Sequence, residues 1–160
     1  MSTEDLYRYH HRINAREGFS IIEQERGLLF RRLIGTGKKI LDIGCRDGTL
    51  TRHFLEGNDV TGADTDSRAL ARAAERGIRT VQFDFNDADW PLQPESFDVV
   101  VAAEVIEHLY FPERVLGRIV KLLKPGGVLV GSVPNAFSLK CRLRYLFGSK
   151  RGTNGMGPGA

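Results

Sequence analysis

Residues 38–50 read KKILDIGCRDGTL, a short apolar run that ends in a glycine-bearing turn. The run Ile40–Ile43 predicts a buried β-strand. Gly44 and Gly48 allow the backbone to turn sharply and to approach a ligand closely. A segment of helical character follows as far as Glu56. Such a turn is a weak functional signal by itself, because many connections from a strand to a helix need glycine.

The same alternation of strand and helix patterns continues along the chain. We expect further strands at Val60–Ala63, Thr80–Phe83, Phe97–Ala103 and Val128–Val133, and helices at Ser67–Arg76 and over an apolar stripe at 115–123. Strands that alternate with helices predict right-handed βαβ units. The fold class is therefore α/β, a doubly wound parallel sheet with helices on both faces.

Segments at the two ends of the chain flank this pattern. Residues 1–37 are expected to form covering helices, and Ser20 and Glu23 have the spacing of a capping box. The buried stripe of a helix over 20–34 is predicted to hold Ile21, Ile22, Leu28, Leu29, Leu33 and Ile34. Residues 38–148 form the expected α/β domain, with a last helix at Ala136–Phe147. Residues 149–160 are expected to be a flexible tail, because glycine is frequent there.

Composition limits the classes of protein to which the chain can belong. It has 160 residues, 41% of them hydrophobic, which suits one globular domain. We expect a cytoplasmic protein, because the sequence shows neither a membrane-spanning run nor a secretory signal. Cys45 and Cys141 match no metal or disulfide pattern.

The charge of the chain is uneven. Net charge is +3, and five basic residues without an acid follow Asn135, namely Lys140, Arg142, Arg144, Lys150 and Arg151. The first three of these residues lie in the predicted C-terminal helix, and this basic helix could bind an anionic membrane surface or a protein partner. The simpler interpretation is a solvated helix face, and nucleic acid is not expected as a partner.

Three carboxylates are predicted at the edge where a doubly wound sheet binds its ligand, beyond the carboxyl ends of the strands. Asp42 lies in the first strand just before the glycine turn, and Asp64, twenty residues after Gly44, can accept hydrogen bonds from both hydroxyls of a ribose. Asp84 follows the third strand and could accept a bond from the exocyclic amine of adenine, or could form an Asx turn with the loop after it. The pattern favours a nucleoside-containing ligand.

These motifs resemble the class I S-adenosylmethionine-dependent methyltransferases over Lys38–Val133. The corresponding segments are Asp42–Gly48 for the first motif, Asp64 for the ribose acid, Asp84-Phe85 for the adenine pair, Ser96–Val100 for the fourth strand and Leu123–Gly127 for the turn before the fifth. The resemblance implies S-adenosylmethionine as cofactor and a Rossmann-like sheet in the order 3-2-1-4-5. It also implies a cofactor site made of Asp42, Gly44, Cys45, Asp64, Thr65, Asp84, Phe85 and Ala102. One departure is Arg46, where the family usually has glycine.

Finer resemblances point in two directions. Asp47–Leu50 and Ser132–Asn135 are similar to the methionine-biosynthesis MetW family, whereas Glu104–Leu109 is similar to quinone and sugar O-methyltransferases and to small-RNA 2′-O-methyltransferases. Family members usually add an antiparallel strand pair after the fifth strand. We expect that pair to be absent here, with the sheet edge covered by the last helix or by a partner.

Glu104, Glu107 and His108 have i, i+3, i+4 spacing, which predicts one shared helical turn on the side of the methyl acceptor. We interpret His108 and Glu104 as catalytic, with His108 taking a proton from an acceptor hydroxyl, and assign no metal ligand. A bound divalent cation, as the RNA enzymes imply, and a structural cluster are the alternatives. His10 and His11 belong to a possible N-terminal lid.

The function predicted from the sequence is methyl transfer from S-adenosylmethionine to a small-molecule or lipid-linked acceptor. A non-catalytic MetW-like accessory protein of methionine biosynthesis and a metal-assisted RNA 2′-O-methyltransferase are the alternatives. Cofactor binding separates the first alternative from the enzyme.

Overall fold

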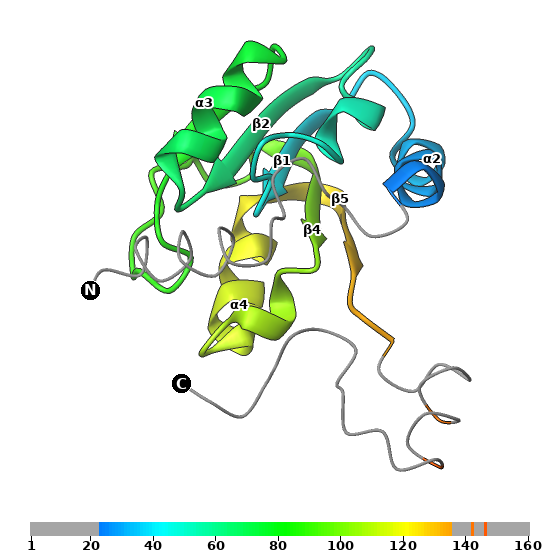
Figure 1. Cartoon of the computed structure of the whole chain (residues 1–160). Helices are drawn as coiled ribbons and strands as arrows, with labels where there is room; N and C mark the ends of the chain where they lie inside the picture. Colours follow the sequence, from blue (N-terminus) through cyan, green and yellow to red (C-terminus); the bar gives the residue numbers. More distant parts are fainter. Residues whose placement is uncertain (1–22, 136–141, 143–145, 147–160) are drawn as a thin grey trace.

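The computed structural model describes residues 23–135, together with Arg142 and Leu146. Five parallel strands form one sheet in that part of the chain, in the order β3-β2-β1-β4-β5 (Figure 1). The strands are β1 Lys39–Ile43, β2 Asp59–Asp64, β3 Arg79–Gln82, β4 Phe97–Ala103 and β5 Leu123–Ser132. Both the α/β class and the strand order expected from the sequence are confirmed.

Helices cover the two faces of the sheet. They are α2 Glu23–Ile34, α3 Ser67–Glu75 and α4 Pro112–Leu122, with 3₁₀ turns η1 at Thr51–Phe54 and η2 at Ile106–His108. One apolar cluster joins Leu41 and Ile43 of β1 to Ile119 of α4. The cluster on the opposite face joins Ile40 of β1 to Phe30 of α2 and also includes residues of η1 and α3. Alternate residues of β1 therefore enter two separate halves of the core, as a sheet buried on both faces requires.

The buried stripe predicted for the helix over 20–34 is confirmed at Ile34 and wrong at its three leucines, whereas Ile21 and Ile22 lie outside the described residues. Helix α2 buries Gly27, Phe30 and Ile34, whereas Leu28, Leu29 and Leu33 are 64%, 55% and 59% exposed. Polar contacts set this rotation of the helix. Glu23 accepts hydrogen bonds from Arg52 at 2.7 Å and from His53 at 2.6 Å, and the ring of His53 occupies the space that a side chain on Gly27 would need.

Two other predicted elements differ in the structure. The helix expected between the first strand and Glu56 is a series of turns that ends in the short η1. The fifth strand begins at Leu123, so the Lys124–Gly127 turn lies within it, opposite a register shift in β4. The ammonium of Lys124 donates to Asp98 of β4 at 2.8 Å, which holds this irregular start against the sheet.

Several expectations fall on other parts of the chain. The predicted helix at Ala136–Phe147, apart from Arg142 and Leu146, and the tail at 149–160 lie outside the described residues. Strand β5 is the edge of the sheet as far as the structure describes it. No helix among the described residues is long and apolar enough to cross a membrane.

Candidate functional site

The glycine turn after β1 lies at the carboxyl edge of the sheet and is tied to the end of β2. The amides of Gly44 and Cys45 both donate to the carbonyl oxygen of Ala63, at 2.8 and 3.2 Å. Gly44 has a φ of 74°, and a Cβ at this position would overlap the side chain of Val105. Glycine is therefore required here both for the left-handed backbone and for space.

Asp64 at the end of β2 is fixed by two backbone amides. Its Oδ2 accepts from the amide of Arg46 at 3.0 Å, and its Oδ1 accepts from the amide of Asp66 at 3.0 Å. The residue is 8% exposed, and burial raises the pKa of its carboxyl. Each carboxylate oxygen still has acceptor capacity after one hydrogen bond, so two donors such as ribose hydroxyls fit this group.

Arg46 holds a left-handed backbone conformation, with a φ of 52°. This conformation aims its amide at Asp64, and it explains why glycine is usual at the position in the family that the sequence resembles. The arginine therefore preserves the backbone geometry of the turn at a cost in backbone strain.

Asp42 is buried beneath the turn. Its Oδ2 accepts a hydrogen bond from the Thr51 hydroxyl at 2.6 Å, which joins β1 to η1. Burial raises the pKa of Asp42 to about 7, and the negative charge of Asp64 acts in the same direction. The structure therefore gives Asp42 a role in holding the turn, and its contact with a cofactor stays a prediction.

The adenine pair predicted from the sequence has structural partners. Asp84 Oδ1 accepts from the amide and from the side-chain nitrogen of Asn86, both at 2.9 Å, which is the Asx-turn arrangement. Phe85 is buried among aromatic rings, with ring centroids 5.2 Å from Phe83 and 6.1 Å from Trp90. A contact of either residue with adenine stays a prediction.

Three further predicted cofactor residues are buried at the same edge. Thr65 accepts a hydrogen bond through its carbonyl from Gln82 at 2.9 Å, and Ala102 is 1% exposed within β4. The thiol of Cys45 faces the sheet, since a Cβ on Gly62 would lie 2.6 Å from its Sγ. Burial raises the pKa of this thiol, so the backbone of Cys45 rather than its sulfur is suited to a ligand.

Glu104, directly after β4, joins three elements. Its Oε1 accepts a hydrogen bond from the Ser132 hydroxyl of β5 at 3.0 Å, and Ser132 in turn accepts one from Arg26 of α2 at 3.0 Å. The same Oε1 lies 3.7 Å from the Arg26 guanidinium. The carboxyl of Glu104 is thus engaged with α2 and β5.

The helical turn predicted to carry Glu104, Glu107 and His108 together is wrong. Glu104 has a φ of 58° and precedes η2, which holds only the other two residues. Its left-handed backbone interrupts the helical spacing. His108 is exposed.

Glu107 is the unsatisfied member of this group. Both of its carboxyl oxygens are buried, and neither accepts a hydrogen bond from a described residue. Burial raises the pKa of Glu107, and the nearby charge of Glu104 raises it further. The sequence motif contained Glu107 but gave no reason to rank it above its neighbours. A buried carboxyl without a partner is costly, so Glu107 is a candidate for contact with a ligand.

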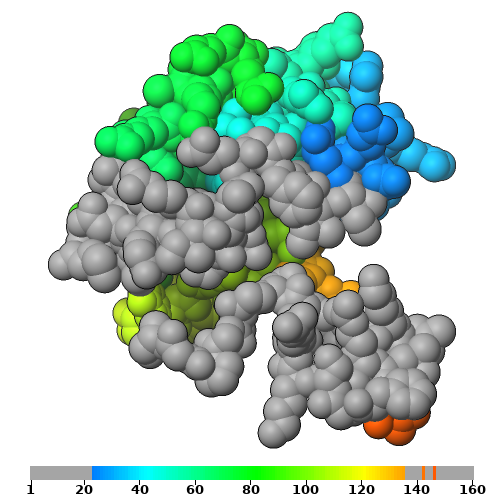
Figure 2. All heavy atoms as spheres, in the orientation of Figure 1, coloured from blue at the N-terminus to red at the C-terminus, as the bar shows by residue number. Residues whose placement is uncertain are grey.

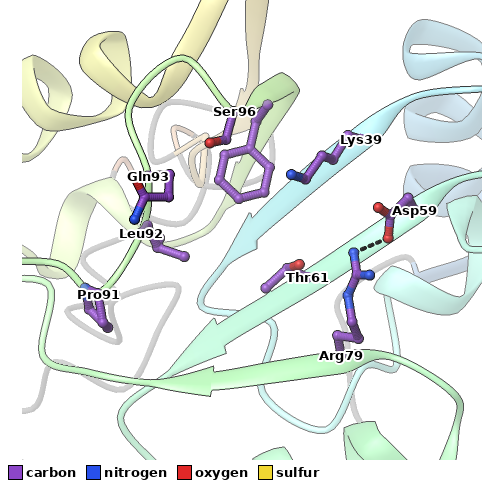
Figure 3. Close-up of a pocket in the computed structure, with 9 residues that line it drawn as sticks. Lys39, Asp59, Thr61, Arg79, Pro91, Leu92, Gln93 and Ser96 are labelled. Carbon is purple, nitrogen blue, oxygen red and sulfur yellow. Dashed lines mark hydrogen bonds and ion pairs between the residues drawn. The ribbon is translucent and has the colours of Figure 1, made fainter.

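Two other features do not extend this site. No group of three or more metal-ligating side chains that could hold an ion occurs among the described residues, and His10 and His11 lie outside them. A groove of about 300 Å³ opens at the amino ends of the strands, where Lys39 and Thr61 face Leu92 and Gln93 (Figure 3). It lies at the opposite edge of the sheet from Asp64.

Comparisons with known proteins agree with this geometry. A family model described as "Methyltransferase domain" matches residues 14–154. The ubiquinone biosynthesis O-methyltransferase of Idiomarina loihiensis is 36% identical in an alignment of 132 residues that covers 78% of this chain and 51% of the relative. The enzyme of the same name from Photobacterium profundum is 35% identical over 105 residues, covering 62% of this chain and 45% of the relative. The chain therefore spans about half the length of these curated relatives.

Solved structures share the fold. The N-methyltransferase NodS of Bradyrhizobium japonicum, solved with S-adenosylhomocysteine, has a TM-score of 0.60 at 29% identity and covers 75% of this chain and 65% of its own. A possible histamine N-methyltransferase of Thermotoga maritima has a TM-score of 0.69 at 20% identity and covers 86% and 66%. The family model matches most of the sequence, and the carboxyl-edge residues suit a nucleoside. The chain thus belongs to the class I S-adenosylmethionine-dependent methyltransferases, and S-adenosylmethionine is its cofactor.

Proposed function

We propose that the protein transfers the methyl group of S-adenosylmethionine to a hydroxyl of a small-molecule acceptor, and that the ring hydroxyl of a quinone precursor is the best-supported acceptor class. The observation that carries the proposal is the Asp64 carboxylate, held by the amides of Arg46 and Asp66 with acceptor capacity left for two more donors. The similarity to ubiquinone biosynthesis O-methyltransferases supports the acceptor class.

The residues proposed to hold the cofactor lie at or just after the carboxyl ends of strands β1 to β4. Asp64 would accept hydrogen bonds from the ribose hydroxyls. Asp84 would accept a hydrogen bond from the adenine amine at a carboxylate oxygen that its Asx turn does not saturate. The backbone of Gly44 and Cys45, the buried Asp42, and Thr65, Phe85 and Ala102 complete the proposed set. When bound, the cofactor supplies a methyl group that its sulfonium has already activated. The protein then mainly holds the acceptor in line, an orientation effect worth roughly 7 to 11 kcal/mol.

A hydroxyl acceptor must lose its proton, and the residues after β4 are proposed to take it. His108 is exposed and remains the proposed general base. Glu107 lies within electrostatic reach of His108, and its raised pKa makes it a better proton acceptor near neutral pH than an ordinary carboxylate. Because Glu104 is engaged with Arg26 and Ser132, its proposed part changes from direct catalysis to positioning of this segment.

Calorimetric titration with S-adenosylhomocysteine tests the cofactor half of the proposal. Asp64→Ala should weaken binding at least about tenfold, because two hydroxyls lose a charged acceptor. Glu56→Ala is the matched control, since Glu56 is an exposed acid paired only with Arg31 among the described residues. Equal affinities in two folded variants would remove Asp64 from the site. A wild-type protein that binds no cofactor would favour the accessory-protein alternative.

Methyl transfer to catechols, with and without an alkyl tail, tests the acceptor half. His108→Ala should keep cofactor affinity within about threefold and should lower turnover by roughly 10²- to 10⁴-fold. Activity that survives this change but is lost with a chelator would favour the metal-assisted alternative. A preference for tailed catechols would support a lipid-linked acceptor.

A lipid-linked acceptor would also bring the protein to a membrane surface. The basic residues Lys140, Arg142 and Arg144 are the proposed contact with anionic lipid or with a protein partner. Binding to anionic vesicles should then fall steeply as salt rises, because salt screens exposed charges. No binding at low salt would leave these residues as a solvated surface.

A further inference from the structure

Helix α2 presents an apolar face to solvent. Leu28, Leu29 and Leu33 are 64%, 55% and 59% exposed, although the opposite side of the helix is anchored in the core. Figure 2 shows α2 in blue at the surface of the molecule. Three adjacent leucines on one exposed helix face are more than the scattered apolar residues that monomeric proteins tolerate, and such patches mark interaction sites.

Charges are placed symmetrically around these leucines. Glu25 precedes Leu28 by three residues, and Arg32 follows Leu29 by three residues. At 3.6 residues per turn, these four residues share the outward face of the helix. When a second α2 is laid antiparallel on this face, Leu28 meets Leu29 of its copy, and Glu25 meets Arg32 of its copy.

Glu25 and Arg32, the two charged residues of this pattern, form no salt bridge among the described residues. Other charged side chains of α2 are paired: Glu23 with Arg52 and His53, Arg26 with Glu104, and Arg31 with Glu56. The charges of Glu25 and Arg32 are therefore available to an external partner.

We propose that a second copy of this chain docks on α2, with the two helices antiparallel and related by a twofold axis between Leu28 and Leu29. Leu28 and Leu29 form the centre of the interface, and a Glu25–Arg32 pair lies on either side of them. A surface that is complementary to itself in this way suits an isologous dimer.

The size of the interface limits its strength. A helix of 12 residues is about 18 Å long, and one helix pair buries less than the roughly 1,600 Å² of a standard interface. We therefore expect a dimer with a dissociation constant in the micromolar range. Because Arg26 of α2 reaches Glu104, the dimer would also steady the helix that contacts the acceptor side of the site.

Sedimentation equilibrium of the full chain over a wide concentration range tests this dimer. Leu28→Gln with Leu29→Gln should raise the dissociation constant at least about tenfold while keeping helix propensity. Val120→Gln is the matched control, since Val120 is 68% exposed on α4 and lies outside the proposed interface. It should leave the dimer unchanged.

A charge exchange tests the antiparallel register. Glu25→Arg or Arg32→Glu alone should weaken the dimer about fivefold or more, because each places like charges opposite one another. The double exchange should restore it to within about threefold of the wild type. A monomer at every concentration would overturn the proposal and indicate that another segment or another partner covers the leucines. A dimer that all of these α2 variants leave intact would also overturn it.

Discussion

Replacement of Asp42 by asparagine should change how the stability of the protein depends on pH. The side chain is 3% exposed, and its Oδ2 accepts a hydrogen bond from Thr51 at 2.6 Å. Asparagine keeps the shape and, with its oxygen toward Thr51, keeps this hydrogen bond. What it removes is the ionisation of a carboxyl whose pKa burial raises from 3.8 to about 7.

The sign of the effect follows from proton binding. Between pH 3.8 and about 7, the folded protein keeps the Asp42 proton that the unfolded chain has lost. The wild-type protein therefore loses stability as pH rises through this interval, and the loss ends above pH 7. Over each pH unit in which the folded and unfolded states differ by one bound proton, the free energy of unfolding changes by about 1.4 kcal/mol. Across the whole interval the loss is about 4 kcal/mol. Asp42→Asn should not show this loss of stability, because asparagine has no carboxyl group to ionise.

Urea unfolding followed by the fluorescence of Trp90, the single tryptophan, measures the effect between pH 5 and pH 8. The stability of Asp42→Asn relative to wild type should be higher at pH 8 than at pH 5 by about 2 to 3 kcal/mol, the part of the interval that lies between these values. Asp98→Asn is the control with a lowered pKa, caused first by the hydrogen bond from Lys124. Its relative stability should not rise with pH. Parallel pH profiles for Asp42→Asn and wild type would refute the reasoning.

Three further substitutions test other parts of the site. Arg46→Gly should raise the free energy of unfolding by about 1 kcal/mol, because glycine relieves the strain of the left-handed backbone. Titration of this variant should find a cofactor affinity equal to or higher than that of the wild type. A clear loss of affinity would reveal a contact between the arginine side chain and the cofactor. Gly62→Ala should lower the free energy of unfolding by about 1 to 3 kcal/mol, because the added methyl group would overlap the side chain of Cys45. In urea unfolding, Cys45→Ala in the same chain should recover part of this loss. Additive effects of the two changes would contradict the predicted clash. Glu107→Gln should lower turnover, and unchanged turnover would exclude Glu107 from proton transfer. Because burial raises the pKa of Glu107 above 4.5, the stability of this variant relative to wild type should also be higher at pH 8 than at pH 4.

The order of the sheet could be predicted because each strand has a local signature. A strand buried on both faces reads as a continuous apolar run, and the bounds predicted for β4 match the structure. The glycine turn could also be predicted from the sequence, since Gly44 and Gly48 adopt positive φ values of 74° and 75°, which glycine favours. Local sequence thus determined the elements that form the carboxyl edge of the sheet.

The orientation of α2 could not be predicted from its own residues. Apolar periodicity favoured a stripe that includes Leu28, Leu29 and Leu33, yet polar contacts from Glu23 and the small Gly27 turn a different face toward the sheet. These contacts involve Arg52 and His53, about thirty residues away, and no local pattern reports them. The difference between the predicted and the observed orientation is informative, because it shows that three leucines of α2 lie on the surface.

One backbone angle in the segment after β4 changes the surroundings of two neighbouring acids. The left-handed φ of Glu104 separates this residue from η2 and is supported by a hydrogen bond from its amide to the carbonyl of Ser132 at 2.9 Å. Its carboxyl then meets Arg26 and Ser132, whereas the buried carboxyl of Glu107 is left without a hydrogen-bond donor among the described residues. A regular helix would have placed the two acids on one face with similar surroundings. The unusual backbone therefore engages one acid in contacts with α2 and β5 and leaves the other without a hydrogen-bond donor among the described residues, as the proposed role of Glu107 in proton transfer requires.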